Sequence, residues 1–309
     1  MTAEPQITWK SALMVATLGL TWGGTFLVTE IALTGITPFW LAAGRIGFAA
    51  LLMTAIWAAL GGRLFTAAPA GGTCAALLTI GAYSTAVPFM LLAWGQQYVT
   101  SGFAGVSMAS VALIVLPLAH FLVPGERMTW RRVVGFLIGF VGVCVLIGGQ
   151  AFEPSGAALE PAGRAACVAA ASCYGVSSVL MRRLPSVDPI GLSTVILIIA
   201  AGIVVPLAWI VEGPPPLPDA RTLGVIAFLG LIPTAAANML RVLVIRGAGP
   251  VFMSLTNYQV PVWSVVLGAW LLGEPLPASL LGAMVLILSG VGLSQYDAFR
   301  RLFGAKPEN

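Results

Sequence analysis

The stretch LVPGER at residues 122–127 decides the fold, because it has a counterpart, LLGEP, at residues 271–275. An offset of 148 residues aligns their Gly-Glu pairs, and an apolar run follows each stretch. Farther upstream the best offset is 149, which places Thr85-Ala86 on Thr234-Ala235. Self-similarity at about half the length of a chain of 309 residues indicates two related halves.

The composition is that of a membrane protein. Hydrophobic residues make up 59% of the chain and charged residues 8%, whereas a soluble domain carries about 25% charged residues. A chain so poor in charge could not cover a soluble surface. The net charge is +4, but the basic residues form no single patch, so we expect no nucleic-acid partner.

The spacing of charged residues predicts the number of membrane spans. A hydrocarbon core about 30 Å thick needs about 20 apolar residues per helix. The chain has nine charge-free stretches of suitable length, and the one at 64–125 is long enough for two spans separated by the polar turn at 94–97. The first stretch, 11–29, lacks a small-x-small cleavage site, so we interpret it as a span and not a signal peptide. We therefore predict an all-α membrane protein with ten transmembrane helices.

The positions of lysine and arginine predict the orientation of these helices. With a cytoplasmic N-terminus, twelve of the 15 basic residues lie on the inside and only Arg164 and Arg221 outside, which satisfies the positive-inside rule. Five helices per half is an odd number, so the halves enter the membrane from opposite sides, as in many secondary transporters. The Glu126 turn is then cytoplasmic and the Glu274 turn external. We expect one five-helix repeat at 1–150 and a second at 151–309, which ends in a short cytoplasmic tail.

Small residues at helical spacing predict where helices pack closely. Gly135 and Gly139 lie four residues apart in the predicted fifth helix, with Gly142 just beyond, and Gly19 and Gly23 do the same in the first. Helices in lipid gain no hydrophobic association, so close packing depends on such small faces. We expect these glycines to lie at helix–helix contacts.

Polar and aromatic residues deep in the spans predict a substrate site. They concentrate in helices 1, 3, 4, 6, 8 and 9, and polar side chains in lipid prefer the bundle interior. Amide and phenol groups, with carbonyls freed near Pro233 and Pro261, can bind a zwitterion, and aromatic faces can hold its side chain. For a single serine, a bond to its own helix backbone is the alternative. The predicted substrate-binding residues are Trp22, Tyr83, Ser107, Tyr174, Asn238, Asn257 and Tyr258.

Two charges within the predicted spans are expected to pair. Glu30 lies near the outer end of the first helix and Arg45 early in the second, and the turn at 34–37 brings them to similar depth. An ion pair would reduce the cost of both charges. His120 is expected at the cytoplasmic interface. With no titratable group deep on the pathway, we expect weak or no proton coupling, with export running down the substrate's own gradient.

The sequence contains no residue set typical of catalysis or metal binding. His120 is the single histidine, which excludes two-histidine metal motifs, and the four cysteines lack paired spacing. We therefore predict no catalytic residues, no metal and no cofactor, and a protein that is not an enzyme.

The chain resembles the drug/metabolite transporter superfamily, specifically its ten-helix EamA type. The resemblance rests on Trp22-Gly23, on PFWLAAGR at 38–45, and on the two Gly-Glu turns, and it covers nearly the whole chain. Among the branches, the YddG-type amino-acid exporters are the most similar. The resemblance implies a bacterial inner-membrane secondary transporter that exports small metabolites, most of all amino acids including aromatic ones, by alternating access through a central cavity. The second half departs from the first in having no arginine that matches Arg45.

Three other functions agree less well with the sequence. A nucleotide-sugar or sugar-phosphate exchanger of the same superfamily needs basic residues facing the cavity, and Arg45 is the one basic residue inside a predicted span. A multidrug exporter would suit the aromatic lining but lacks a deep central carboxylate. A membrane-embedded enzyme needs paired carboxylates or metal ligands at depth, which are absent from the sequence. As partners we expect the small-molecule substrate and membrane lipids, and we expect a monomer.

Overall fold

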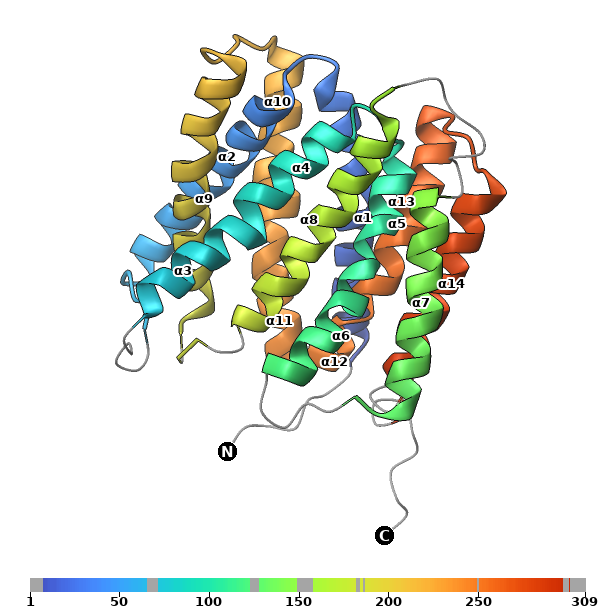
Figure 1. Cartoon of the computed structure of the whole chain (residues 1–309). Helices are drawn as coiled ribbons and strands as arrows, with labels where there is room; N and C mark the ends of the chain where they lie inside the picture. Colours follow the sequence, from blue (N-terminus) through green and yellow to red (C-terminus); the bar gives the residue numbers. More distant parts are fainter. Residues whose placement is uncertain are drawn as a thin grey trace.

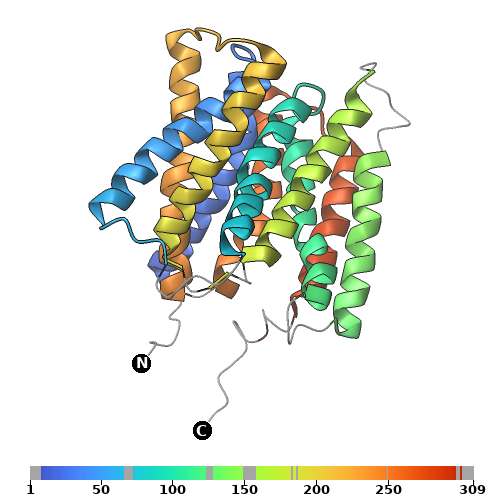
Figure 2. The same ribbon diagram turned by 60° about the vertical axis from the view of Figure 1, so that its left-hand side comes forward.

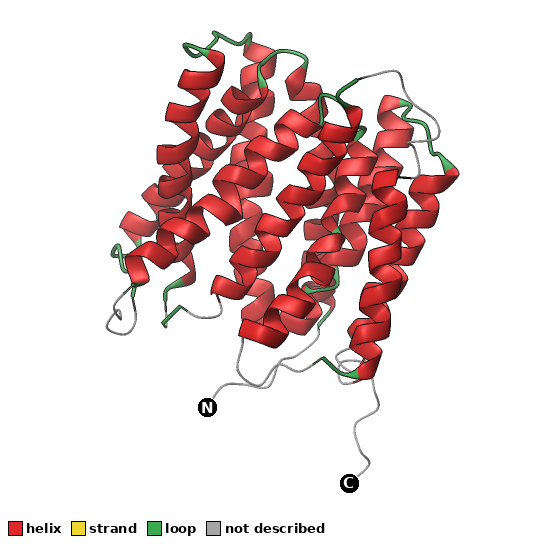
Figure 3. Ribbon diagram, in the orientation of Figure 1, coloured by secondary structure: helices red, strands yellow, loops and turns green. Residues whose placement is uncertain are grey.

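The chain folds into a bundle of helices (Figures 1 and 3). The computed structural model describes residues 8–65, 72–122, 128–148, 158–181, 184–185, 187–248, 250–296 and 300. These residues form no strand, apart from an isolated bridge between Phe65 and Val187. The α-helices are α1 (Trp9–Leu33), α2 (Pro38–Ala59), α3 (Thr73–Gly81), α4 (Val87–Gly95), α5 (Ser101–Met108), α6 (Ser110–Leu122), α7 (Trp130–Gly148), α8 (Glu160–Met181), α9 (Pro189–Glu212), α10 (Ala220–Leu229), α11 (Ala237–Ala248), α12 (Pro250–Met253), α13 (Thr256–Leu272) and α14 (Ala278–Ser294). Two π-helices, η1 (Ala82–Ala86) and η2 (Gly230–Ala236), join α3 to α4 and α10 to α11.

The described helices are long and apolar enough for a multi-pass membrane protein. Eight helical segments meet the length and hydropathy of a membrane span, and α14 is a shorter apolar helix. The predicted span at 247–273 contains α12 and α13. Large apolar side chains are exposed on the outside of the bundle, as lipid-facing surfaces require, for example Leu51, Phe121, Ile210 and Trp270. The turn predicted at 94–97 is confirmed, since α4 ends at Gly95 and α5 begins at Ser101.

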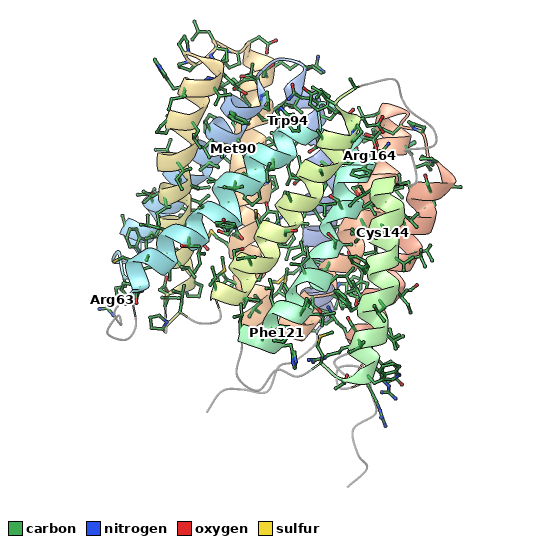
Figure 4. All side chains as sticks on the ribbon, in the orientation of Figure 1. Arg63, Met90, Trp94, Phe121, Cys144 and Arg164 are labelled. Atoms are coloured by element: carbon green, nitrogen blue, oxygen red, sulfur yellow. The ribbon has the colours of Figure 1, made fainter. Side chains whose placement is uncertain are left out.

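The chain runs back and forth between two ends of the bundle. In Figure 1, α1 starts at the lower end, and its connection to α2 lies at the upper end. The connections from α4 to α5, α9 to α10 and α13 to α14 also lie at the upper end. Figure 4 shows Arg63 at the lower end and Arg164 toward the upper end.

The two π-helices occupy positions that the repeat offset relates. Adding 149 to the residue numbers of η1 gives positions inside η2, and Thr85 of η1 aligns with Thr234 of η2. A proline accompanies each: Pro88 follows η1 and Pro233 lies within η2. Proline removes a backbone donor and frees the carbonyl four residues before it. The wide turns are therefore a local consequence of these prolines, and π-helical turns occur often at functional sites.

Each π-helix packs against a helix from the other half of the chain. Gly81, just before η1, contacts Ile199 of α9, and Gly230, at the start of η2, contacts the Arg45 carbonyl and Phe48 of α2. Helices α2 and α9 also pack on each other. Figure 2 brings this side of the bundle forward. The residues around both wide turns are thus held by contacts that cross between the halves.

Helices α7 and α14 pack through glycine, as the small-residue spacing predicts. Gly135 and Gly139 of α7 face Gly290 of α14 so closely that a Cβ on Gly290 would overlap backbone atoms of both. Gly142 contacts Ile287 one turn farther along. In the same way Gly23 of α1 contacts Trp263 of α13.

Two helix N-termini at the upper end are capped by distant glutamates. Glu212, the last residue of α9, accepts hydrogen bonds from Thr37 Oγ1 (2.6 Å), Phe39 N (2.9 Å) and Trp40 N (3.1 Å) at the start of α2. Glu274, after α13, accepts from Ser101 N (2.8 Å) and Gly102 N (3.0 Å) at the start of α5. A carboxylate at a helix N-terminus satisfies free N–H groups and interacts favourably with the helix dipole.

Some features of the sequence analysis lie outside the described residues. These are the Glu126 turn, the larger part of the boundary between the predicted repeats, and the C-terminal tail.

The glycine contact between α7 and α14 predicts opposite effects for two similar substitutions. Alanine normally stabilises a helix by about 1 kcal/mol relative to glycine, so Gly282→Ala, at a position with no neighbour within 4 Å, should leave the melting temperature unchanged or raise it. Gly290→Ala should lower it, because over-packing costs about 1–3 kcal/mol. Thermal unfolding of both variants in detergent measures the difference. Equal melting temperatures would contradict the close contact.

Candidate functional site

Polar groups from several helices meet around η2, with Thr234 at the centre. Pro233 frees the carbonyl of Leu229 four residues before it, and Thr234 Oγ1 donates to that carbonyl (2.8 Å). The same oxygen accepts a hydrogen bond from Arg45 Nε (2.8 Å). Asn238 Nδ2 donates to the Thr234 carbonyl (2.6 Å). The wide turn thus fixes a threonine that holds side chains from α2 and α11.

Arg45 is the charged group of these residues, and Arg45, Thr234 and Asn238 are called the Arg45 cluster below. Its guanidinium lies over the ring of Phe89, 4.2 Å from the ring centre, and within electrostatic reach of the Tyr174 phenol. The side chain is surrounded by protein yet keeps part of its surface accessible. Among the described residues no carboxylate forms an ion pair with it. Helices α2, α4 and α8 and the η2 turn therefore surround a guanidinium that retains capacity to bind an anion.

The predicted ion pair between Glu30 and Arg45 is wrong. Arg45 bonds to Thr234, whereas Glu30 lies against the carboxylate of Glu274. The error arose from counting charge-free stretches, which placed Arg45 at the start of a span. The helix in fact begins at Pro38, so Arg45 lies two turns, about 10 Å, inside it. Thr37 and Pro38 are typical helix-start residues, and counting from them would have placed Arg45 at depth. Counting charge-free stretches thus placed Arg45 too close to the end of its helix.

Trp22, Asn238 and Tyr174 are the predicted site residues that the structure brings to this cluster. Trp22 Nε1 donates to the carbonyl of Pro233 (3.0 Å), so the carbonyl predicted to accept from a substrate ammonium is engaged by the indole. Asn238 is joined to Thr234 as described, and its Oδ1 remains available as an acceptor. All three side chains are partly accessible.

The other four predicted site residues have no recorded contact with the Arg45 cluster. Ser107 is fully buried and donates to Ala104 O of its own helix (2.7 Å), as expected for the backbone-bonding alternative. Tyr83 is 40% exposed on η1, and Asn257 is exposed in the first turn of α13. Tyr258 is partly buried against the apolar core.

A second arginine, Arg241, lies near the cluster in sequence. It was not predicted as a site residue because it marks the end of a charge-free stretch. Arg241 follows Asn238 by three residues on α11, and residues at this spacing lie on the same helix face. Its side chain is exposed although protein surrounds it.

An apolar groove lies apart from these polar groups. It has a volume of about 290 Å³ and shares no residue with the Arg45 cluster. Met90 and Trp94 of α4, labelled in Figure 4, belong to it. It offers no charged group, so we place the candidate site at Arg45. The residues that line the groove are Phe39, Val87, Met90, Leu91, Trp94 and Leu207.

Comparisons with known proteins agree with a membrane transporter. The model of the EamA-like transporter family matches the chain twice, over residues 9–148 and 162–295. The uncharacterized inner membrane transporter YedA of Escherichia coli (strain K12) is 29% identical over 94% of this chain and 91% of its own. A probable terminal-alkyne amino-acid exporter of Streptantibioticus cattleyicolor is 27% identical over 97% of this chain and 95% of its own. A crystal structure with 22% identity matches 94% of this chain and 99% of that chain with a TM-score of 0.63, which shows the fold. The chain therefore belongs to the EamA-like transporter family.

Proposed function

We propose that the chain forms ten membrane spans in two five-helix repeats, 1–150 and 151–309, which enter the membrane from opposite sides. The double match of the family model, the offset that relates the two π-helices, and their crossed packing on α9 and α2 support this arrangement. The lower end of the bundle in Figure 1 is the cytoplasmic end, since Arg63 lies there and the basic residues favour that side. The protein acts in a bacterial inner membrane as a monomer.

The function that the site supports best is export of amino acids, including aromatic ones, by alternating access. The observation that carries this proposal is the Arg45 guanidinium, held by Thr234 and Phe89 but paired with no carboxylate among the described residues. A buried guanidinium forms strong, directional hydrogen bonds with a carboxylate. We infer that the substrate carboxylate binds Arg45, where the sequence analysis had assigned the whole zwitterion to neutral groups.

The remaining groups of the cluster suit the other parts of an amino acid. The Oδ1 of Asn238 can accept a hydrogen bond from the substrate ammonium. The rings of Trp22 and Tyr174 can pack on an apolar or aromatic side chain. The amino-acid substrate named for the relative from Streptantibioticus cattleyicolor supports this class of substrate.

Arg241 favours a second candidate, a sugar-phosphate or nucleotide-sugar exchanger. A phosphate carries more charge than a carboxylate, and a second arginine one turn from Asn238 would stabilise it. We prefer the amino acid because only Arg45 is bonded into the cluster. The substrate experiment below separates the two candidates.

The orientation predicts which introduced cysteines react from outside. In a chain whose exposed Cys74 and Cys144 are replaced by serine, a cysteine at Pro275 should react with a membrane-impermeant maleimide added to intact cells. A cysteine at Arg63 should react only after the cells are opened. The reverse pattern would contradict the orientation.

Binding of the substrate carboxylate by Arg45 predicts how transport depends on the substrate's charge. In counterflow with proteoliposomes, the wild type should take up phenylalanine about 10- to 100-fold faster than phenylalaninamide, since a hydrogen bond to a charged group contributes about 1.5–3 kcal/mol. Arg45→Gln should slow phenylalanine to about the rate of the amide. The exposed arginine substitution Arg221→Gln is the matched control and should keep the wild-type preference.

Two results would change the assignment. Equal loss of both substrates' transport in Arg45→Gln, with normal folding, would show that Arg45 is structural. Faster exchange of a sugar phosphate than of phenylalanine, abolished by Arg241→Gln, would favour the second candidate.

A further inference from the structure

Two carboxyl groups face each other at the upper end of the bundle. Glu30 lies in the last turn of α1, and its side chain lies against Glu274 and beside the Ser101 backbone. Glu274 follows α13 and packs over Gly268 and Gly102. The residues come from three elements, so their approach is a property of the tertiary fold.

The N-terminus of α5 binds the carboxylate of Glu274. The two carboxylate oxygens of Glu274 accept hydrogen bonds from Ser101 N (2.8 Å) and Gly102 N (3.0 Å). Backbone N–H groups and the positive end of a helix dipole both interact favourably with a carboxylate. The Ser101 backbone also donates to Glu30, and two carboxyl groups in contact do not both remain ionised. One proton shared by the two groups relieves this repulsion.

A second observation indicates that this cluster holds a ligand. Among the residues that the structure describes, neither the fully buried hydroxyl of Ser101 nor the buried Glu30 Oε2 has a hydrogen-bond partner. Ser101 Oγ and Glu274 Oε2 both lie next to Gly268. A buried polar atom without a partner is energetically costly, so such atoms are expected where a proton or ion is bound in part of the cycle.

We propose that Glu30 and Glu274 together bind one proton, and that this proton holds α1 to the start of α5 and the turn after α13, which closes the upper end of the bundle. Loss of the proton leaves two facing carboxylates, and their repulsion loosens this contact. The site therefore makes opening of this end depend on pH, contrary to the weak proton dependence expected from the sequence. It does not depend on which substrate is transported.

In the part of the chain that the structure describes, no positive charge near the pair replaces the proton. Of the elements packed against α1, α13 contributes no charged side chain, α5 contributes Ser101, and α4 contributes Gln96, which donates to Phe26 O. Arg45 of α2 is bound to Thr234. Arg221 is exposed at the start of α10, and Arg241 of α11 lies five residues, between one and two turns, beyond the end of η2. Arg164 of α8 faces Phe103 of α5 and is paired with Glu160.

The thermal stability of the purified protein in detergent tests this proposal without substrate. The melting temperature of the wild type should fall between pH 5.5 and pH 8.5, because one proton changes the equilibrium up to about tenfold per pH unit. The glutamine of Glu30→Gln resembles the protonated acid and can donate to Glu274. This variant should lose the fall in melting temperature over this pH range and stay as stable as the protonated wild type. Glu212→Gln is the matched control, since Glu212 also caps a helix N-terminus at this end but faces no carboxyl group in the structure. It should keep the wild-type pH dependence.

Opening is measured separately through Cys167, which is fully buried. The other three cysteines are replaced in both the wild type and Glu30→Gln, and the rate at which maleimide labels Cys167 is measured in each at the same pH. The ratio of the wild-type rate to the Glu30→Gln rate should rise at least several-fold from pH 5.5 to pH 8.5. If Glu30→Gln does not fold, Glu274→Gln, whose amide can donate to Glu30, should remove the same pH dependence. Identical pH profiles in the wild type and either variant would overturn the proposal. Stabilisation of the wild type by sodium over potassium at pH 8.5, absent in Glu30→Gln, would also overturn it and indicate a sodium site.

Discussion

The placement of one guanidinium inside the bundle determines how the proposed site works. A charge at the centre of a membrane helix costs about 3 kcal/mol or more, and such charges usually pair with each other. Arg45 is held by one neutral oxygen, Thr234 Oγ1, and by the ring of Phe89. These contacts orient the guanidinium without neutralising it. Its remaining donors suit an anion that arrives and leaves, which is what a transported substrate does.

The wide turn at η2 makes this arrangement possible. Pro233 breaks the regular hydrogen bonding of the helix, and Thr234 satisfies the freed carbonyl of Leu229 while accepting from Arg45. Trp22 and Asn238 occupy the neighbouring carbonyls. Irregular backbone inside a membrane protein is tolerated where it is buried in protein or lines a cavity. The break is thus satisfied locally, and its position next to α2 creates the cluster.

The sequence predicted the parts of the fold that depend on composition and periodicity. The all-helical membrane class, the turn at 94–97 and the glycine face of α7 follow from hydropathy and spacing, and the family was recognised from short motifs. The repeat offset also located the second π-helix, although nothing in the sequence analysis foresaw that the turn would be π-helical. These features are local, so they could be predicted without knowing which helices are neighbours.

The site was predicted less well because it depends on tertiary neighbours. Trp22, Tyr174 and Asn238, chosen by depth and chemistry, lie at the Arg45 cluster, but Ser107 bonds to its own helix, and Asn257 is exposed. Glu30 and Arg45 appeared to be partners because one short turn joins their helices. In the structure each meets a residue more than 180 positions away, Glu274 and Thr234. Such long-range pairing has no signature in hydropathy or charge spacing.

The most direct test of the central claim is a structure of the protein determined with phenylalanine bound. The account predicts a carboxylate oxygen about 3 Å from the Arg45 guanidinium, with the aromatic ring near Trp22 or Tyr174. A bound amino acid whose carboxylate lies away from Arg45, held by Asn257 or Tyr83 while Arg45 contacts only protein groups, would contradict it.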